Sequence, residues 1–265
     1  MSRPIGVIGG SGLYSLLPHA DEVTVETPYG RTSDPPVIAD VADRQVVFVP
    51  RHGRDHRHPP HRVPYRANLW ALHSLGVRQI LAPCAVGALD RTLSPGDLVV
   101  PDQILDRTCG RDATFYDEGA VHVPFADPYC PHGRAAVMAA GADSGWEVRD
   151  GGTMVVVDGP RFGTRAESQW HAAAGGTLVN MTGMPEAVLA RELAVCYTAV
   201  ALVTDLDAGM SAGEAVTQDD VYAVFGESVG RLRSLLLDVV TVLSDERDCA
   251  CGLALDGTPA EGRWA

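Results

Sequence analysis

The sequence predicts an α/β protein with a single domain, in which helices flank a central mixed sheet that is mostly parallel. Short apolar runs of strand length recur along the chain, stretches with apolar residues at helical spacing lie between them, and polar residues follow directly after several runs. A chain of 265 residues is long enough to bury a sizeable core. We expect the domain to span residues 1–246, and residues 247–265, which are rich in Gly, Ala and Asp, to form a flexible tail.

The expected strands are short runs of β-branched and aliphatic residues that lie between turn residues. They are residues 5–8, 45–50, 79–82, 98–100, 153–157, 178–181 and 199–203. Pro83 is expected to break the third of these strands, because proline lacks the backbone N–H that a sheet needs. Thr204 and Asp205 are expected to end the last strand.

The expected helices share apolar residues at a spacing of three and four. They are residues 66–76, the segment from Pro185 to about Leu193, and residues 217–244. Thr217 suits the N-cap of the last helix, since Asp219 and Asp220 follow in its first turn.

Reactive or anion-binding groups stand at the ends of five expected strands. These positions are residues 9–12, Arg51 with His52, Cys84 with Ala85, Met181 with Thr182, and residues 205–207. In parallel α/β sheets, ligands gather at the carboxyl ends of the strands. The five groups are therefore expected to meet in one pocket.

The charge balance argues against a nucleic-acid partner. Lys and Arg number 21 and Asp and Glu number 34, so the formal net charge is −13, which repels a phosphate backbone. A small anion would need a local pocket that overcomes this field. We find no apolar run of the roughly 18–20 residues that a membrane helix needs, and no signal peptide, so we expect a cytoplasmic protein.

The cysteines give no clear indication of a disulfide framework or a metal site. There are six, at positions 84, 109, 130, 196, 249 and 251. Cys249 and Cys251 can in principle bind a metal or form a regulatory disulfide, but the sequence lacks a second ligand pair at zinc spacing. We therefore expect ordinary thiols and no metal site.

The glycine-rich turn at residues 9–12 fails the dinucleotide-binding pattern G-x-G-x-x-G, because Ser15 stands where the last Gly or Ala is needed. A tight turn whose amides and Ser11 hydroxyl hold an anion is one interpretation. An ordinary turn between a strand and a helix is the other.

Arginines and histidines alternate after the second strand, at residues 51–62. The interleaved arginines argue against a metal site, since cations repel one another. Arg51, directly after the strand, suits a phosphate or another oxyanion. A solvated loop remains the alternative.

Asp205 and Asp207 lie on one side of an extended segment. Two such carboxylates can share a proton, which raises one pKa and suits a general acid. A metal-binding pair and a plain turn remain open. Phe162 can stack on a flat ring or belong to the core.

Taken together, these stretches resemble the nucleoside phosphorylase family, and within it the trimeric branch that contains 5′-methylthioadenosine phosphorylase. The matching stretches run in family order and cover most of residues 5–244. They are IGVIGGSGLY (5–14), RHGRDH (51–56), VPYRANLWAL (63–72), AVGALDRTLSPGDLVVPDQILDRT (85–108), HVPFADPYCP (122–131), GTMVVVDGPRFGTRAES (152–168), NMTGMPEAVLARE (180–192) and VTDLDAG (203–209).

The resemblance implies roles for the residues at matching positions. The implied phosphate site comprises Ser11, Arg51, His52, Ala85 and Thr182, with Cys84 beside them. Met181 would contact the ribose through its main chain, Phe162 would stack on the base, and Asp205 and Asp207 would face the purine. His122 would reach the 5′ end of the sugar in a neighbouring subunit. The family implies a homotrimer with shared active sites, inorganic phosphate as co-substrate, and no metal or redox cofactor.

The chemistry of these residues fits the cleavage of an N-glycosidic bond. Positive charge develops on the sugar and negative charge on the purine. Asp205, assisted by Asp207, can protonate the leaving base near N7. Phosphate held by Arg51, Ser11 and Thr182 can stabilise the cationic sugar and attack C1.

Three departures from the family pattern bear on the substrate. Cys84 replaces the usual Thr or Asn of the phosphate loop, and a thiol is a weaker donor. Gly163 replaces a Ser after the stacking Phe. The third departure concerns the pocket for the 5′ end of the sugar, which is apolar where it takes a methylthio group. In this chain we expect Gln218, Val221 and Tyr222 there. Gln218 and Tyr222 can bond a 5′-hydroxyl, and the alternative is that Gln218 points to solvent.

We therefore expect phosphorolysis of 5′-methylthioadenosine to adenine and 5-methylthioribose 1-phosphate, as in purine and methionine salvage. The alternative is a general purine nucleoside phosphorylase acting on inosine, adenosine or methylthioinosine. The acid pair favours 6-aminopurines, whereas the NMTGMPE segment also occurs in relatives that take 6-oxopurines. A nucleosidase that uses water, a dinucleotide-dependent enzyme and an inactive scaffold are the weaker competitors.

Overall fold

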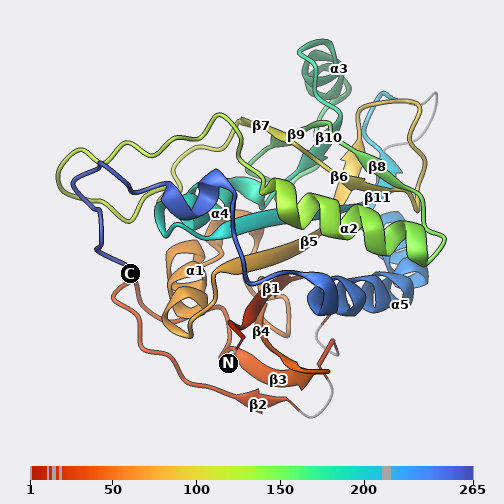
Figure 1. Ribbon diagram of the computed structural model, residues 1–265. Helices are drawn as coiled ribbons and strands as arrows, with labels where there is room; N and C mark the ends of the chain where they lie inside the picture. Colours follow the sequence, from red (N-terminus) through yellow and green to blue (C-terminus); the bar gives the residue numbers. More distant parts are fainter. Residues whose placement is uncertain (1, 11, 14–15, 18–19, 211–215, 265) are drawn as a thin grey trace.

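The computed structural model describes residues 2–264 apart from residues 11, 14–15, 18–19 and 211–215 (Figure 1). Its strands are β1 (Ile5–Gly9), β2 (Asp21–Glu22), β3 (Val37–Val41), β4 (Arg44–Pro50), β5 (Gln79–Ala88), β6 (Leu98–Val100), β7 (Gln103–Asp106), β8 (Val148–Asp150), β9 (Thr153–Val156), β10 (Leu178–Asn180) and β11 (Cys196–Leu206). Its α-helices are α1 (Tyr65–Ser74), α2 (Pro131–Asp143), α3 (Arg165–Ala173), α4 (Gly183–Glu192) and α5 (Gln218–Val242). Two short 3-10 helices, η1 (Pro60–Arg62) and η2 (Ala250–Leu253), complete the list.

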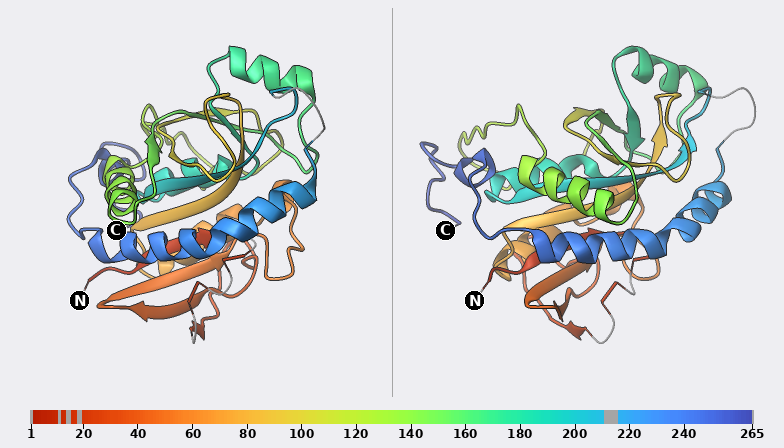
Figure 2. Two further views of the ribbon diagram at one scale, coloured as in Figure 1. Left: turned by 90° about the vertical axis from the view of Figure 1, so that its right-hand side faces the viewer. Right: turned by 45° about the vertical axis from the view of Figure 1, so that its right-hand side comes forward.

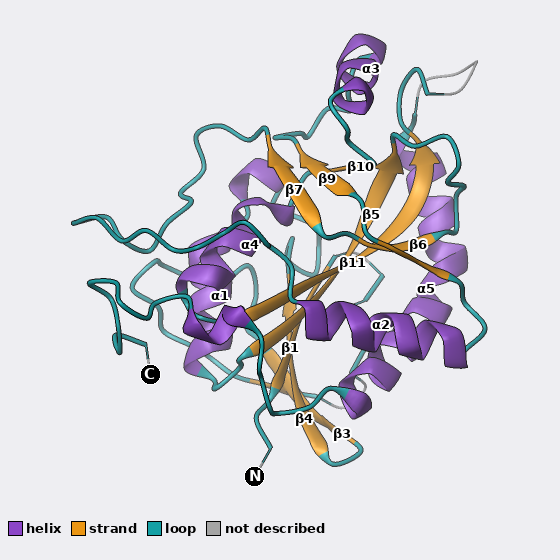
Figure 3. Cartoon of the chain, turned by 45° about the horizontal axis from the view of Figure 1, so that its top comes forward, coloured by secondary structure: helices purple, strands orange, loops and turns teal. Residues whose placement is uncertain are grey.

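All the described strands join one mixed sheet centred on β5. This strand pairs in parallel with β1 and β11 and antiparallel with β10. The pairs β1–β4, β9–β10, β7–β9 and β6–β8 are also parallel, whereas the pairs β2–β3, β3–β4 and β6–β11 are antiparallel. The predicted class, a mostly parallel mixed sheet flanked by helices, is confirmed (Figure 3).

Two apolar cores lie on opposite faces of the sheet, because alternate residues of a strand point to opposite sides. In β11, Ala199, Ala201 and Val203 join the core that holds α1 and α4. Val200 and Leu202 join the core that holds α2 and α5. Figure 2 shows the length of α5 along its side of the sheet, and α3 standing out from the body.

The predicted break at Pro83 is wrong, since β5 continues through it to Ala88. Pro83 stays in register with Val200 of β11. On the other side, β1 pairs with β5 only as far as Leu81, so a missing N–H at Pro83 costs no bond to β1.

β11 also extends further than expected, through Asp205 to Leu206. A register shift between Val203 and Asp205 marks a bulge in its pairing with β5. A bulge re-aims the side chains around it without ending the strand, so Asp205 is held by the sheet rather than by a loop.

Several elements gave no sequence signal: β2, β3, β7, β8, α2 and α3. Strands β2, β3 and β7 have no fully buried residue, and the short apolar run of β3 follows two prolines and is interrupted by Asp40. Helix α2 is rich in Ala and Gly, and α3 is mostly polar, so neither carries a strong apolar stripe. The predicted helix 217–244 is confirmed, with Thr217 as N-cap in a capping box with Asp220.

The C-terminal segment is packed, contrary to the expected flexible tail. Leu255 and Ala260 are buried with Tyr116, and the Trp264 indole N–H donates to the Tyr116 hydroxyl over 2.9 Å. The prediction relied on the Gly- and Ala-rich composition of this segment and overlooked the few apolar side chains that hold it in place. No helix in the described part of the chain is long and apolar enough to cross a membrane.

Candidate active site

A cavity of about 820 Å³ lies at the carboxyl ends of the central strands, and its size suits a small-molecule ligand. It brings together the strand-end groups that the sequence singled out. The predicted residues that line it are Arg51, His52, Cys84, Ala85, Phe162, Gly163, Met181, Thr182, Asp205, Asp207, Gln218, Val221 and Tyr222. Ser11 lies outside the described residues, although its neighbour Gly10 lines the cavity. The prediction of one shared pocket is confirmed for the other strand ends.

Arg51 is fixed at one end of the cavity by a buried ion pair. Its Nε and Nη2 donate to the two oxygens of Glu186 over 2.6 and 3.0 Å, and its Nη1 donates to the Pro83 carbonyl over 3.0 Å. Burial works against the charge, but the Glu186 carboxylate raises the pKa of Arg51 further above its ordinary value. These bonds account for three of five guanidinium donors, so Arg51 keeps donor capacity for an anion.

Glu186 is a functional residue that sequence reasoning missed. It is 1% exposed, and the Tyr197 hydroxyl donates to its Oε2 over 2.8 Å. It stands in the first turn of α4, inside the segment NMTGMPEAVLARE. An acidic residue in an otherwise apolar helix was the available signal, since a buried carboxylate needs a charged partner.

His52 is held as a neutral imidazole. Burial, and next the charge of Arg51, lower the pKa of His52 to about 3. Its Nδ1 lies 2.8 Å from the His58 carbonyl, so Nδ1 carries the proton and Nε2 is a hydrogen-bond acceptor. The ring stacks on His56 with 4.4 Å between the ring centroids. His52 therefore adds no positive charge to the cavity at neutral pH.

Asn180, at the end of β10, links the start of α4 to the neighbouring strand β5. Its Oδ1 accepts from the backbone N–H groups of Thr182 and Gly183 over 2.7 and 2.6 Å. Its Nδ2 donates to the Ala85 carbonyl over 3.2 Å. Asn180 Oδ1 accepts from these first amides of α4 and also from the Thr182 hydroxyl over 3.4 Å, so an anion beside Thr182 would have to draw that hydroxyl away from Asn180. Burial raises the pKa of Cys84 to about 12, so Cys84 stays a protonated thiol.

The two acids lie where β11 ends, and different hydroxyls hold them. Thr204 donates to Asp205 Oδ2 over 2.8 Å, and Ser168 donates to Asp207 Oδ2 over 2.6 Å. Burial raises the pKa of Asp205 to about 6, the Thr204 hydroxyl opposes this, and the charge of Asp207 adds to it. Such a pKa suits a group that gives up a proton near neutral pH.

Gly87 of β5 leaves room for both carboxylates. A Cβ at this position would lie 3.0 Å from Asp205 Oδ1 and 3.2 Å from Asp207 Cβ. Gly163 is close as well, since a Cβ there would lie 3.3 Å from Ser168 Oγ and 3.6 Å from Asp207 Oδ2. Ser168 thus reaches Asp207 from α3, next to the position where the family usually has a serine.

Phe162 lines the cavity and is only partly buried, so it does not belong to the core. Its loop is held at the start of α3. Arg161 donates to both oxygens of Glu167 over 2.8 and 2.7 Å, and Thr164 forms a capping box with Glu167. The ring is therefore presented by an anchored loop.

Arg111 is a second residue that sequence reasoning missed. Its side chain is 3% exposed and contacts the two loops that border the cavity. Nη1 donates to the Met181 carbonyl and Nη2 donates to the Asp158 carbonyl, each over 2.9 Å. Nη1 also donates to the Tyr65 hydroxyl over 3.1 Å. A lone arginine in a polar loop carries no pattern that would have revealed this.

The far end of the cavity is formed by the first turns of α5. Val221 and Phe225 contribute apolar surface there, while Gln218 and Tyr222 are exposed at the rim. Gln218 thus both lines the cavity and is exposed to solvent, so each of the two positions considered for it, in the 5′ pocket or in solvent, holds in part. His122 is exposed and lies outside the set of residues that line the cavity of its own chain.

The sequence pattern of the phosphorylase superfamily matches residues 4–241, and this chain belongs to that superfamily. A purine nucleoside phosphorylase of Streptomyces coelicolor is 57% identical over 264 residues, covering 96% of this chain and 94% of that protein. An S-methyl-5′-thioadenosine phosphorylase of Mycolicibacterium smegmatis is 56% identical over 254 residues, covering 96% of each. A crystal structure of methylthioadenosine phosphorylase from an antarctic soil metagenomic library has a TM-score of 0.90 at 39% identity, covering 97% of this chain and 92% of that one. The predicted family is therefore confirmed.

Proposed function

We propose that the protein catalyses the phosphorolysis of 5′-methylthioadenosine to adenine and 5-methylthioribose 1-phosphate. The observation that carries this proposal is the half-buried acid Asp205, with a pKa raised to about 6, in the same cavity as the fixed cation Arg51. The similarity to methylthioadenosine phosphorylases in sequence and structure supports it. An acid for the leaving base and a cation for phosphate are the two groups that this reaction needs.

In the proposed reaction, an oxygen of phosphate bonds to C1′ as the bond between C1′ and N9 breaks. The electron pair of that bond goes to the purine, and Asp205 gives its proton to N7. Asp207, held by Ser168, accepts a hydrogen bond from the 6-amino group. This assignment favours adenine over a 6-oxopurine as the leaving base, because a carboxylate repels a carbonyl oxygen.

Phosphate would bind at Arg51, Ser11 and Thr182, with Cys84 and Ala85 beside it. The neutral His52 suits this site as an acceptor, since its Nε2 can take a hydrogen bond from the hydroxyl of hydrogen phosphate. The charged oxygens then turn toward the guanidinium and the sugar. Since phosphate attacks directly and Asp205 supplies the proton, we expect catalysis without a metal or a redox cofactor.

The ribose would lie between Phe162 and the phosphate site. The Met181 carbonyl already accepts from Arg111, so we assign the main-chain ribose contact to the Met181 N–H. Val221 and Phe225 suit a methylthio group at the 5′ end. We further propose a cytoplasmic homotrimer in which His122 completes the 5′ end of a neighbouring site, which its exposed position outside its own cavity allows.

A general purine nucleoside phosphorylase is the second candidate. It is favoured by the 57% identical relative of that name and by the polar groups of Gln218 and Tyr222 at the rim of the cavity. In that case both side chains would contact a 5′-hydroxyl.

Base release from 5′-methylthioadenosine, adenosine and inosine, each with and without phosphate, tests both candidates. We expect phosphate-dependent adenine release, with the highest kcat/KM for 5′-methylthioadenosine. A preference for adenosine or inosine would establish the second candidate. Release without phosphate would indicate a nucleosidase and would overturn the assignment of the anion site.

A further inference from the structure

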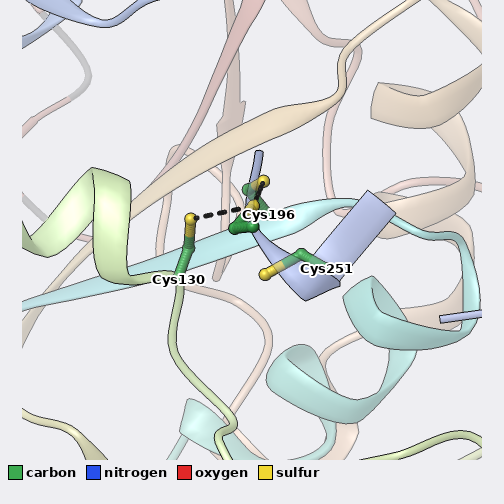
Figure 4. Close-up of side chains that lie close together, drawn as sticks. Cys130, Cys196 and Cys251 are labelled. Carbon is green, nitrogen blue, oxygen red and sulfur yellow. Dashed lines mark hydrogen bonds between the residues drawn. The ribbon is translucent and has the colours of Figure 1, made fainter. Parts of the chain in front are cut away.

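Four cysteines that lie far apart in the sequence meet on the side of the molecule where the C-terminal segment packs. Cys130 precedes α2, Cys196 begins β11, and Cys249 and Cys251 flank the start of η2. All four are buried, and their sulfur atoms lie within 4.8 Å of one another. Figure 4 shows Cys130, Cys196 and Cys251 converging from these separate elements.

The distances between the sulfurs suit a common ligand. Cys249 Sγ lies 3.4 Å from Cys196 Sγ and 3.8 Å from Cys130 Sγ. Four sulfurs that each bind one Zn²⁺ ion at about 2.3 Å in a tetrahedron lie about 3.8 Å apart. A disulfide would bring two sulfurs to about 2.05 Å. The cluster thus has nearly the dimensions of a tetrathiolate cage without any bonded pair.

Positively charged side chains and backbone donors lie beside the sulfurs of the cluster. Arg191 Nη2 lies 3.9 Å from Cys251 Sγ, and Arg247 Nη1 lies 4.0 Å from Cys196 Sγ. The sulfur of Cys130 accepts hydrogen bonds from the backbone N–H groups of His132 and Gly133, at the N-terminus of α2. A zinc ion with four thiolates carries a net charge of −2, and two guanidinium groups balance that charge.

We propose that Cys130, Cys196, Cys249 and Cys251 form a structural site for a thiophilic divalent cation, with zinc as the expected metal. Four cysteine ligands complete a tetrahedron and leave no open position for a substrate. Among the described residues that line the catalytic cavity, none belongs to this cluster. The second ligand pair, absent from the sequence near Cys249 and Cys251, comes from Cys130 and Cys196.

The site would fasten the C-terminal segment to the body of the protein. Cys130 and Cys249 are 119 positions apart, so the ligands come together only in the folded chain, and the free energy of metal binding would stabilise the fold. The fastened segment also carries Trp264, which packs edge-on against Trp70 of α1. Removal of the metal should therefore loosen the segment and lower the melting temperature.

The test uses the full chain, expressed in medium supplemented with zinc and purified under reducing conditions without chelator. Elemental analysis should find about one zinc per chain in the wild type and in Cys109→Ser, a control that removes an exposed cysteine. Cys251→Ser should hold at least 10-fold less zinc. A chelator should lower the melting temperature of the wild type and the control and leave that of Cys251→Ser nearly unchanged.

Three results would overturn the proposal. One is a wild type that takes up no zinc, even after incubation with zinc sulfate, while its buried thiols remain titratable after unfolding. Another is full zinc content in Cys251→Ser, which would mean adventitious binding elsewhere. The third is an intact mass, measured without reductant on protein from the zinc-supplemented culture, that shows the four cysteines joined as two disulfides. If Cys251→Ser fails to fold, thiol titration of the folded wild type decides the second point: removal of zinc by a chelator should make the cluster's thiols reactive, and removal of zinc with no change in thiol reactivity would mean binding elsewhere.

Discussion

Replacing Asp205 by Asn should lower activity and raise stability at the same time. Asn keeps the size of the side chain and can still donate a hydrogen bond toward N7, but it cannot transfer a proton. Loss of a general acid costs typically 10²–10⁴-fold. We therefore expect kcat/KM for 5′-methylthioadenosine to fall by at least about 100-fold.

The expected gain in stability follows from the pKa of Asp205, which is raised from 3.8 to about 6 by burial. A raised pKa means that the ionised carboxylate is less favourable in the fold than in the unfolded chain. Its cost is absent below pH 3.8, grows as the pH rises, and is complete above about pH 6, where it reaches about 3 kcal/mol. The Asn variant lacks this cost, so it should be more stable at pH 7 by up to about that amount.

The assays are steady-state kinetics between pH 5 and 8 and urea unfolding at pH 7. The wild type should lose kcat/KM as the pH rises through about 6, because Asp205 loses its proton there. The variant should lack this limb. Asp40→Asn, at an exposed position of β3, is the matched control and should change neither quantity. Near-normal turnover, or a variant less stable than the wild type at pH 7, would refute the reasoning. Inosine should be tried as well, since Asn can bond a 6-oxopurine.

The remaining predictions concern residues that hold the site. Glu186→Gln leaves the buried Arg51 cation without its counter-charge. We expect the free energy of unfolding in urea to fall by on the order of 3 kcal/mol and the KM for phosphate to rise. If both values stay unchanged, the ion pair does not support an anion site. Arg111→Met frees the Met181 loop, so kcat/KM should fall about 100-fold, and a loss of stability alone would contradict this positioning role. Ser168→Ala removes the hydroxyl that donates to Asp207, so kcat/KM for 5′-methylthioadenosine and adenosine should fall roughly 10-fold. An unchanged kcat/KM would show that this hydrogen bond does not orient Asp207.

Much of the site was predictable because its polar groups interrupt apolar strands. The contrast between Val49 and Arg51, or between Val203 and Asp205, is visible along the chain, and the rule for parallel sheets then gathers such ends at one edge. Apolar runs of strand length explain the correct placement of β1, β4 and β6, and the helical apolar spacing with the Thr217 cap explains that of α5.

The missed features depend on contacts between distant segments. Arg111 and Glu186 act through partners up to 135 positions away, and Pro83 fits in β5 because β1 departs two residues earlier. The four-cysteine cluster is of the same kind, since 119 positions separate two of its members. Local sequence patterns carry no information on contacts between such distant residues. At the C-terminus, the Gly- and Ala-rich composition led to the wrong prediction of a flexible tail, because a few apolar side chains hold the segment in place.

Gly87 limits how the base end of the cavity can be redesigned. Both acids pack so closely against Gly87 that not even a Cβ fits there without a shift. The backbone at position 87 therefore limits the size of the side chains at positions 205 and 207. Isosteric exchanges between Asp and Asn fit within that limit, whereas longer acids or amides at either position would press on the β5 backbone. A new purine preference must therefore come from a change in protonation and hydrogen-bond pattern at constant volume, with any added bulk placed at Phe162 rather than at Gly163, where a Cβ would lie 3.3 Å from Ser168 Oγ.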